Sequence, residues 1–362
     1  MHRPAVAVLF GGRSSEHAIS SATAGGVLRA IDRERYRVIP IGITRTGAFV
    51  LEDDDPDKFA LEADRLPEVI DNGTRIVWPE GGGDRALRVR HSGGEHADLG
   101  VVDVVLPILH GLHGEDGTIQ GFLDTLQLPY AGGGVLDSAL CMDKHFMKIA
   151  LQAAGVPVAP WVTVRRSRWK GDPAGVRADA AALGEVLFVK PARAGSSVGV
   201  SKVHHAGELD AALALAFAED DKVLIESALV GREVEVGVLE GRGGSTACAS
   251  LPGEVVLTTR EFYDFAGKYL GGDGVDVRCP AELEASDIQA IQALGVRAFD
   301  AVDGRGLARV DFFLTDDGLV VNELNTMPGF TPISMFPKCW IASGMTYAEL
   351  ITELIDTALE RA

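Results

Sequence analysis

Two carboxylates, an arginine and an asparagine are spaced in this sequence so that they can share one face of a predicted β-hairpin. Side chains on a strand alternate between its two faces. Arg309 and Asp311 therefore point the same way on a first strand. After an Asp-Gly turn signal at Asp317-Gly318, Glu323 and Asn325 share a face on the return strand. The hairpin thus offers three oxygen ligands and one guanidinium.

Ligands that are all oxygen suit a hard ion such as Mg²⁺, which binds few carboxylates and shares its other positions with water and phosphate. Arg309 beside such an ion would stabilise negative charge that develops on a substrate. The competing interpretation is a solvated surface hairpin with an ordinary Arg–Asp contact. The apolar residues of both strands, 307–314 and 319–325, favour the metal site. Strict alternation would also place Val321 on the face of Glu323.

Several apolar stretches predict the elements that position this hairpin. Residues 5–10 read as a buried parallel strand, followed by a loop, a helix and a second strand at 37–43. Another strand, 101–109, ends at His110, and ligand sites gather at such strand ends. No Gly-x-Gly-x-x-Gly is present, so a nicotinamide cofactor is not expected. Residues 51–98 are acidic and Gly-rich, which predicts a surface insertion.

A second α+β segment carries basic residues and a loop of small residues. A strand at 186–191 ends in Lys190-Pro191, and the Gly/Ser loop 192–199 could cradle phosphates through its backbone amides. The loop is not a P-loop, because no Gly-x-x-x-x-Gly-Lys-[Ser/Thr] occurs. The next strand, 223–229, carries Glu226 in its middle.

Length, charge and cysteine usage limit the class of protein. A chain of 362 residues can form two or three domains. Its 52 acidic and 34 basic side chains give a formal charge of −18, which argues against nucleic-acid and anionic-membrane partners. The four cysteines form no Cys-x-x-Cys pair, and no 18-residue apolar stretch occurs. These features predict a cytoplasmic enzyme that acts on small molecules.

In combination, these motifs resemble those of ATP-grasp ligases and, more narrowly, D-alanine:D-alanine ligases. The resemblance covers nearly the whole chain and rests on four signatures: His110-Gly111-x-x-Gly114-Glu115-Asp116-Gly117, Met142-Asp143-Lys144, Lys190-Pro191-Ala192-Arg193-x-Gly195-Ser196-Ser197-x-Gly199, and Asn322-Glu323-Leu324-Asn325-Thr326-Met327-Pro328-Gly329-Phe330. It implies an α/β ATP-grasp fold, with an N-terminal parallel-sheet domain like that of biotin carboxylase and two α+β domains that clamp ATP. The three domains are expected at 1–137, 138–229 and 230–362.

The resemblance also implies which residues hold the nucleotide and its metal ions. The nucleotide-binding residues would be two phosphate-binding lysines, the closing loop, the adenine hinge and a ribose-binding acid, with Lys268 included: Lys144, Lys190, Ser196, Ser197, Glu226, Ala228, Leu229, Glu233 and Lys268. Two Mg²⁺ ions, for which Mn²⁺ could substitute, would be held by Asp311, Glu323 and Asn325.

The amino-acid sites follow from the same resemblance. The first D-alanine would bind Glu16 through its ammonium, in a network with Ser196 and Tyr269 and near His110. The tetrahedral intermediate would be stabilised by Arg309 and the Gly329 amide, and the second D-alanine would bind at Ser334 and Met335.

The implied reaction joins two D-alanine molecules through a D-alanyl phosphate, for peptidoglycan synthesis. Relatives that make D-alanyl-D-lactate lack the tyrosine and have a histidine in the corresponding loop, so Tyr269 favours an amine as the nucleophile. Met335 favours D-alanine over D-serine as the acceptor. Two alternatives stay open: a ligase that uses D-serine or D-lactate, and a nucleotide-binding protein without catalysis. The family resemblance also implies a homodimer.

Overall fold

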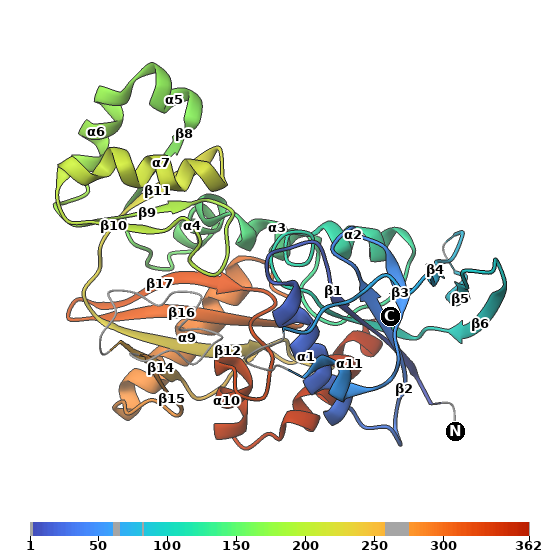
Figure 1. Ribbon diagram of the computed structural model, residues 1–362. Helices are drawn as coiled ribbons and strands as arrows, with labels where there is room; N and C mark the ends of the chain where they lie inside the picture. Colours follow the sequence, from blue (N-terminus) through green and yellow to red (C-terminus); the bar gives the residue numbers. More distant parts are fainter. Residues whose placement is uncertain (1–2, 61–65, 82, 258–274, 362) are drawn as a thin grey trace.

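The computed structural model describes residues 3–60, 66–81, 83–257 and 275–361, and these form four sheets with helices packed against them (Figure 1). The N-terminal sheet contains, in spatial order, β3 (Phe49–Leu51), β2 (Arg37–Ile43), β1 (Ala5–Gly11) and β7 (Val104–Ile108). β1 is parallel to both β2 and β7, and all seven of its residues are buried. Alternate residues of β1 therefore enter two cores, one on each face of the sheet.

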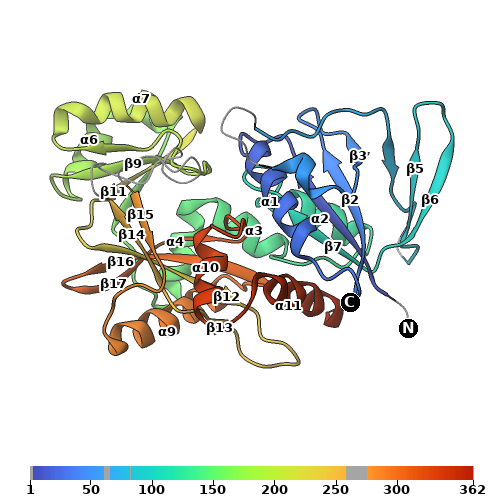
Figure 2. The same ribbon diagram turned by 60° about the horizontal axis from the view of Figure 1, so that its bottom comes forward.

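Helices that are far apart in the sequence cover this sheet. α1 (His17–Ala30) and α11 (Tyr347–Glu360) pack in the core on one face, and α2 (Thr118–Thr125) packs on the other. Figure 2 shows α11 beside α1, next to the N-terminal sheet. Asp356 of α11 accepts a hydrogen bond from the Tyr36 hydroxyl at 2.7 Å and forms an ion pair with Arg35 at 2.6 Å. Helix α11 therefore packs with the N-terminal sheet, although it lies more than 300 residues after β1 in the sequence.

Residues 51–98 are more than the surface insertion that the sequence predicts. They include the 3₁₀-helix η1 (Pro56–Phe59) and most of a small sheet of β4 (Arg75–Val77), β5 (Ala86–Arg90) and β6 (His96–Val101). Phe59 and Leu87 are almost completely buried and join the two N-terminal cores. The sequence does not predict this burial, because most residues of the segment are polar and only a few apolar side chains reach the core.

A second sheet is antiparallel. Helices cover one of its faces, and the other face carries polar residues. Its strands are, in spatial order, β10 (Ser201–Val203), β9 (Leu187–Pro191), β11 (Lys222–Ser227) and β8 (Trp161–Arg165). Its helices are α5 (Arg166–Gly171), α6 (Pro173–Ala181) and α7 (Leu209–Glu219), with η2 (Ala206–Glu208) before α7. α6 and α7 share a core with one face of the sheet. Because strand residues alternate, Phe188, Lys190 and Glu226 lie on the opposite face.

The largest sheet is antiparallel and also has one apolar face and one polar face. Its strands are β15 (Val275–Arg278), β14 (Gly253–Leu257), β12 (Arg232–Leu239), β16 (Leu307–Thr315) and β17 (Gly318–Asn325), with β13 (Cys248–Ala249) paired to β12. Its helices are α3 (Val135–Met142), α4 (Lys144–Ala153), α9 (Ala285–Ala301) and α10 (Met335–Ala342). α3, α4 and α9 share the apolar core on one face. The opposite face carries charged residues of β12, β16 and β17 that line a cavity together with residues of β9 and β11. Figure 1 shows β9 and β10 next to β16 and β17.

Within the described ranges, none of the helices combines the length and the apolar character that crossing a bilayer requires.

Candidate active site

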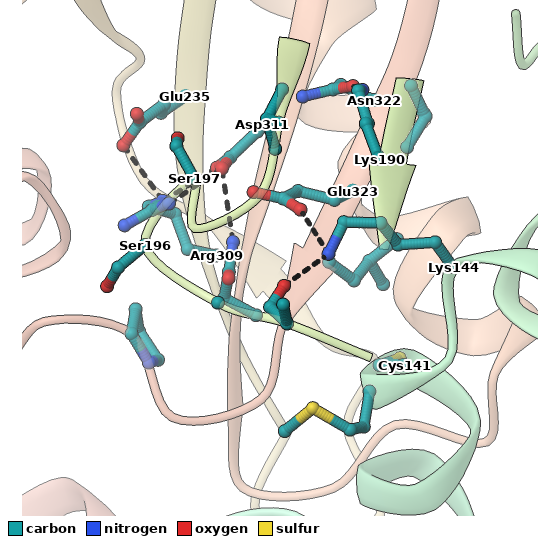
Figure 3. Close-up of a pocket in the computed structure, with 18 of the residues that line it drawn as sticks. Cys141, Lys144, Lys190, Ser196, Ser197, Glu235, Arg309, Asp311, Asn322 and Glu323 are labelled. Atoms are coloured by element: carbon teal, nitrogen blue, oxygen red, sulfur yellow. Dashed lines mark hydrogen bonds and ion pairs between the residues drawn. The ribbon is translucent and has the colours of Figure 1, made fainter. Parts of the chain in front are cut away.

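A cavity of about 210 Å³ lies between the polar faces of the two antiparallel sheets (Figure 3). Glu16 and His110, which follow strands of the N-terminal sheet, also line it. It brings together most of the residues that the sequence assigns to a site. The predicted residues that line it are Glu16, His110, Lys144, Lys190, Ser196, Ser197, Glu226, Leu229, Glu233, Arg309, Asp311, Glu323, Asn325 and Gly329.

The hairpin of β16 and β17 forms as predicted, with one irregularity. Its register pairs Arg309 with Asn325 and Asp311 with Glu323, so all four side chains share a face. The pairing shifts after Asp311, which leaves Asn322 as an extra, bulged residue.

The bulge overturns one detail of the strict alternation. Val321 pairs with Phe312 and lies with it in the apolar core, instead of sharing the face of Glu323. In exchange, Asn322 lies beside Glu323, and its Oδ1 accepts a hydrogen bond from Lys190 Nζ at 3.3 Å. The bulge therefore adds a polar contact to the site.

Arg309 is held between two carboxylates. Its Nε lies 2.6 Å from Asp311 Oδ1 and 2.8 Å from Glu235 Oε2, and a second nitrogen donates to Asp311 Oδ2 at 2.6 Å (Figure 3). Burial alone would lower the pKa of Arg309, but Asp311 and Glu235 raise it well above its ordinary value. The guanidinium is thus a fixed, permanent positive charge in the cavity.

Three lysines approach the cavity from the other side. Lys190 Nζ donates to Glu226 at 2.9 Å, and the fully buried Lys148 lies 3.4 Å from the same carboxylate. Burial alone would raise the pKa of Glu226, but the two lysines lower it, so it is ionised. Lys144 Nζ lies 3.5 Å from Glu323 and donates to the carbonyl of Ala194 at 2.9 Å.

The loop after β9 covers the end of the cavity that Glu16 and His110 line, called here the N-terminal corner. Ser196 and Ser197 both have left-handed backbone conformations, with φ of 51° and 58°, which L-residues with side chains rarely adopt. In this conformation Ser196 Oγ donates to Glu16 Oε1 at 2.5 Å. The contact joins the loop to the first turn of α1, a pairing across 180 residues of sequence.

His110 is the buried base of this corner. Its Nδ1 donates to the carbonyl of Met327 at 3.0 Å, so the unprotonated Nε2 is left as an acceptor. Nε2 has no hydrogen-bond partner among the described residues. Burial lowers the pKa of His110, although the Glu16 carboxylate opposes this effect. A neutral histidine beside Glu16 is suited to accept a hydrogen bond from a substrate ammonium.

Glu115 is a buried acid of the cavity to which sequence reasoning gave no role. Its carboxylate accepts from the Gly111 amide at 2.5 Å and from the Met327 amide at 3.3 Å. Burial, together with Glu16, raises the pKa of Glu115 to about 8. Its place within the histidine signature was visible in the sequence, but its contact with Met327 spans 212 residues and left no local pattern. Lys148, Glu235 and Asn322 were missed for the same reason.

Some of the predicted residues do not line the cavity. Ala228 uses its amide to bond the carbonyl of Val186 at 3.1 Å. Ser334 precedes α10, and its hydroxyl bonds that of Thr331. Met335 is buried against Val255. Lys268 and Tyr269 lie outside the described residues.

The donor set fits a hard divalent ion that also binds a polyphosphate. Asp311 and Glu323 offer carboxylate oxygens and Asn325 offers an amide oxygen, from neighbouring positions on two paired strands. Within the described ranges, no group of three or more His, Cys, Asp or Glu side chains is arranged to hold a metal by itself. An ion here would need further oxygens, and Lys144 and Lys190 could hold the phosphates that supply them.

Known proteins match this chain over almost its whole length. Residues 5–133 match the family described as D-ala D-ala ligase N-terminus, and residues 150–356 match D-ala D-ala ligase C-terminus. A D-alanine–D-alanine ligase from Arthrobacter sp. is 52% identical, over 99% of this chain and 95% of the relative.

Solved structures agree with these matches. A D-Ala:D-Ser ligase from Enterococcus faecalis has a TM-score of 0.84 and 32% identity, over 99% of this chain and 100% of that one. A D-alanine-D-alanine ligase from Coxiella burnetii has a TM-score of 0.82 and 35% identity, over 100% of this chain and 95% of that one. The predicted ATP-grasp fold is confirmed, and the chain belongs to the D-alanine–D-alanine ligase family.

Proposed function

We propose that this protein is an ATP-dependent ligase that joins two molecules of D-alanine into D-alanyl-D-alanine for the bacterial cell wall. The observation that carries the proposal is the cavity in which Arg309 and the hairpin carboxylates face Lys144 and Lys190, with Glu16 and His110 at one end. The family implies ATP and a divalent metal as requirements. The product is a building block of peptidoglycan.

The nucleotide binds between the two antiparallel sheets. Lys144 and Lys190 hold its phosphates, the Ser196–Ser197 loop closes over them, and Glu226, Ala228 and Leu229 form the adenine hinge. Glu233 binds the ribose hydroxyls. Asp311, Glu323 and Asn325 would hold two Mg²⁺ ions, for which Mn²⁺ could substitute, and such ions would supply positive charge to neutralise the phosphates.

The amino acids bind toward the N-terminal sheet. Glu16 pairs with the ammonium of the first D-alanine, and the neutral His110 accepts a hydrogen bond from it. The first D-alanine carboxylate attacks the terminal phosphoryl group of ATP, the bond from that phosphorus to the bridging oxygen breaks, and ADP leaves with an acyl phosphate formed. The amine of the second D-alanine, held near Ser334 and Met335, then attacks the acyl carbon and releases phosphate.

Arg309 stabilises the negative charge that develops in both steps. Its position is fixed before substrate binds, because Asp311 and Glu235 already orient its guanidinium. The Gly329 amide contributes a further donor, and Tyr269 and Lys268 complete the binding of the amine and the nucleotide.

A second candidate acceptor is D-serine. The likeness to the Enterococcus faecalis D-Ala:D-Ser ligase, with a TM-score of 0.84, favours testing it. A single side chain such as Met335 separates two small acceptors by only about 1–3 kcal/mol.

The remaining features of the proposal concern organisation. We propose that the protein acts as a homodimer in the cytoplasm, where free thiols such as its four cysteines rarely form permanent disulfides. We also propose three domains at 1–137, 138–229 and 230–362, of which the last two clamp ATP, with α11 returning to the first.

The test is phosphate release from Mg·ATP with D-alanine, D-serine, D-lactate or L-alanine supplied, with the products identified by mass. We expect phosphate and D-alanyl-D-alanine with D-alanine alone. Arg309→Ala should lower kcat by about 10²–10³-fold, whereas Arg177→Ala, which breaks an exposed ion pair with Asp210, should not change it. Turnover only with D-serine or D-lactate present would assign a sister ligase, and ATP binding without phosphate release would refute catalysis.

A further inference from the structure

Two cysteines meet where β15 packs against α10. Cys279 follows β15 and Cys339 lies within α10, and their sulfur atoms are 3.6 Å apart. A disulfide requires about 2.0 Å between sulfurs, so closing the gap needs a shift of less than two ångströms. No other cysteine is near in sequence, and neither sulfur belongs to the site described above.

The two thiols differ in a way that suits a two-step oxidation. Cys339 is fully buried, beside Val255 and Met335, whereas Cys279 is partly exposed to solvent. The contact with the Cys339 thiol lowers the pKa of Cys279, burial opposes this effect, and Lys338 lowers the pKa further. Cys279 is therefore the reachable, more nucleophilic sulfur, and Cys339 is placed to attack it after oxidation.

The pair is connected to the active site through backbone packing. Cys339 Sγ contacts the carbonyl of Glu235 at 3.9 Å, and the side chain of Glu235 holds Arg309. α10 also packs closely against β14. A Cβ added at Gly253 of β14 would lie 2.2 Å from the sulfur of Met335 and 3.2 Å from that of Cys339. A displacement of Cys339 must therefore move α10 or the strand that carries Glu235.

We propose that Cys279 and Cys339 are an oxidisable dithiol, and that their disulfide lowers ligase turnover by displacing α10 and Glu235. The regulatory half of this proposal rests on the proposed function. The oxidant is a hydroperoxide, and a small dithiol reverses the reaction.

The chemistry balances in two steps. The Cys279 thiolate attacks one peroxide oxygen, the O–O bond breaks, and the departing oxygen takes up a proton to leave water and a sulfenic acid on Cys279. The Cys339 sulfur then attacks the Cys279 sulfur, the S–S bond forms, the S–O bond breaks, and water leaves with the Cys339 proton. Two thiols lose two electrons, and hydrogen peroxide becomes two waters.

The first experiment treats the reduced, full-length protein with hydrogen peroxide and maps its disulfides by mass spectrometry. The expected product has lost about 2 Da and contains a Cys279–Cys339 crosslink, which dithiothreitol removes. Cys248→Ser serves as the background, because Cys248 is exposed and can react by itself. Oxidation that stops at Cys279 sulfinic acid, with Cys339 still open to alkylation after denaturation, would overturn the proposal.

Turnover is measured on the same samples. We expect a loss of turnover that dithiothreitol restores, and no loss in Cys279→Ser or Cys339→Ser. A crosslink that forms without loss of turnover would overturn the regulation. If the reduced protein releases no phosphate with any acceptor, the proposed function fails, while the crosslink still decides the dithiol chemistry.

Discussion

Glu115 is a residue of the cavity whose charge depends strongly on its surroundings. A glutamate has an ordinary pKa of 4.5, and burial, with the nearby Glu16, raises the pKa of Glu115 to about 8. The folded protein holds this proton more tightly than the unfolded chain does. The contribution of Glu115 to the free energy of unfolding is therefore constant below about pH 4.5, falls as pH rises to about 8, and is constant again above it.

Glu115→Gln cannot titrate, so comparing it with the wild type isolates this effect. We expect the stability of the wild type relative to Glu115→Gln to decline between about pH 5 and about pH 8, as measured by urea unfolding at a series of pH values. Glu34→Gln makes the same change of residue type at an exposed position and serves as the control for the substitution itself. A Glu115→Gln difference that stays constant across this range would contradict the raised pKa.

The loop between β7 and α2 depends on a residue without a side chain. Gly111 has a left-handed φ of 70°, and a Cβ there would lie 2.6 Å from Glu16 Oε2. Gly111→Ala should therefore push Glu16 away from Ser196, in addition to a backbone cost of about 1–2 kcal/mol. We expect a large loss of kcat/KM for D-alanine together with lower stability.

The matched control for this loop is Gly94→Ala in the turn between β5 and β6. Gly94 has a φ of 86°, and nothing lies within 4 Å of an added Cβ, so the substitution imposes backbone strain without a clash. It should lower the midpoint of thermal unfolding but leave kcat/KM unchanged. Equal kinetics in the two variants would show that Gly111 matters only for its backbone.

Elements with a local signal could be predicted from the sequence, and contacts between elements could not. The hairpin of β16 and β17 has alternation and an Asp-Gly turn, and its four polar residues do share a face. The bulge at Asn322 escaped because one extra residue in a strand leaves no compositional trace. The burial of Phe59 escaped because one aromatic residue in a polar segment carries no period.

At the scale of the whole molecule, Asp356 joins parts of the chain that lie far apart in sequence. It accepts from Arg35 and the buried Tyr36, and Arg242 of the loop after β12 lies 3.4 Å away. Asp356→Ala leaves the Tyr36 hydroxyl and two guanidinium groups without this partner. We expect the free energy of unfolding to fall by about 2–4 kcal/mol, as measured by urea unfolding.

Asp210→Ala tests whether this loss depends on burial. Asp210 pairs with Arg177 at 2.6 Å, and both side chains are about half exposed. Its removal should cost less than about 1 kcal/mol. A similar loss in both variants would mean that Asp356 acts as an ordinary surface charge.

The packing of α11 on the N-terminal sheet has a consequence for biosynthesis. β1 and β7 leave the ribosome early, but the core on one of their faces lacks Leu350 and Leu354 until α11 has been made. At about 5–20 residues per second, that wait is on the order of ten seconds or more. Until then α1 covers this apolar face without α11, so the nascent chain exposes apolar surface that chaperones can bind until α11 has packed beside α1.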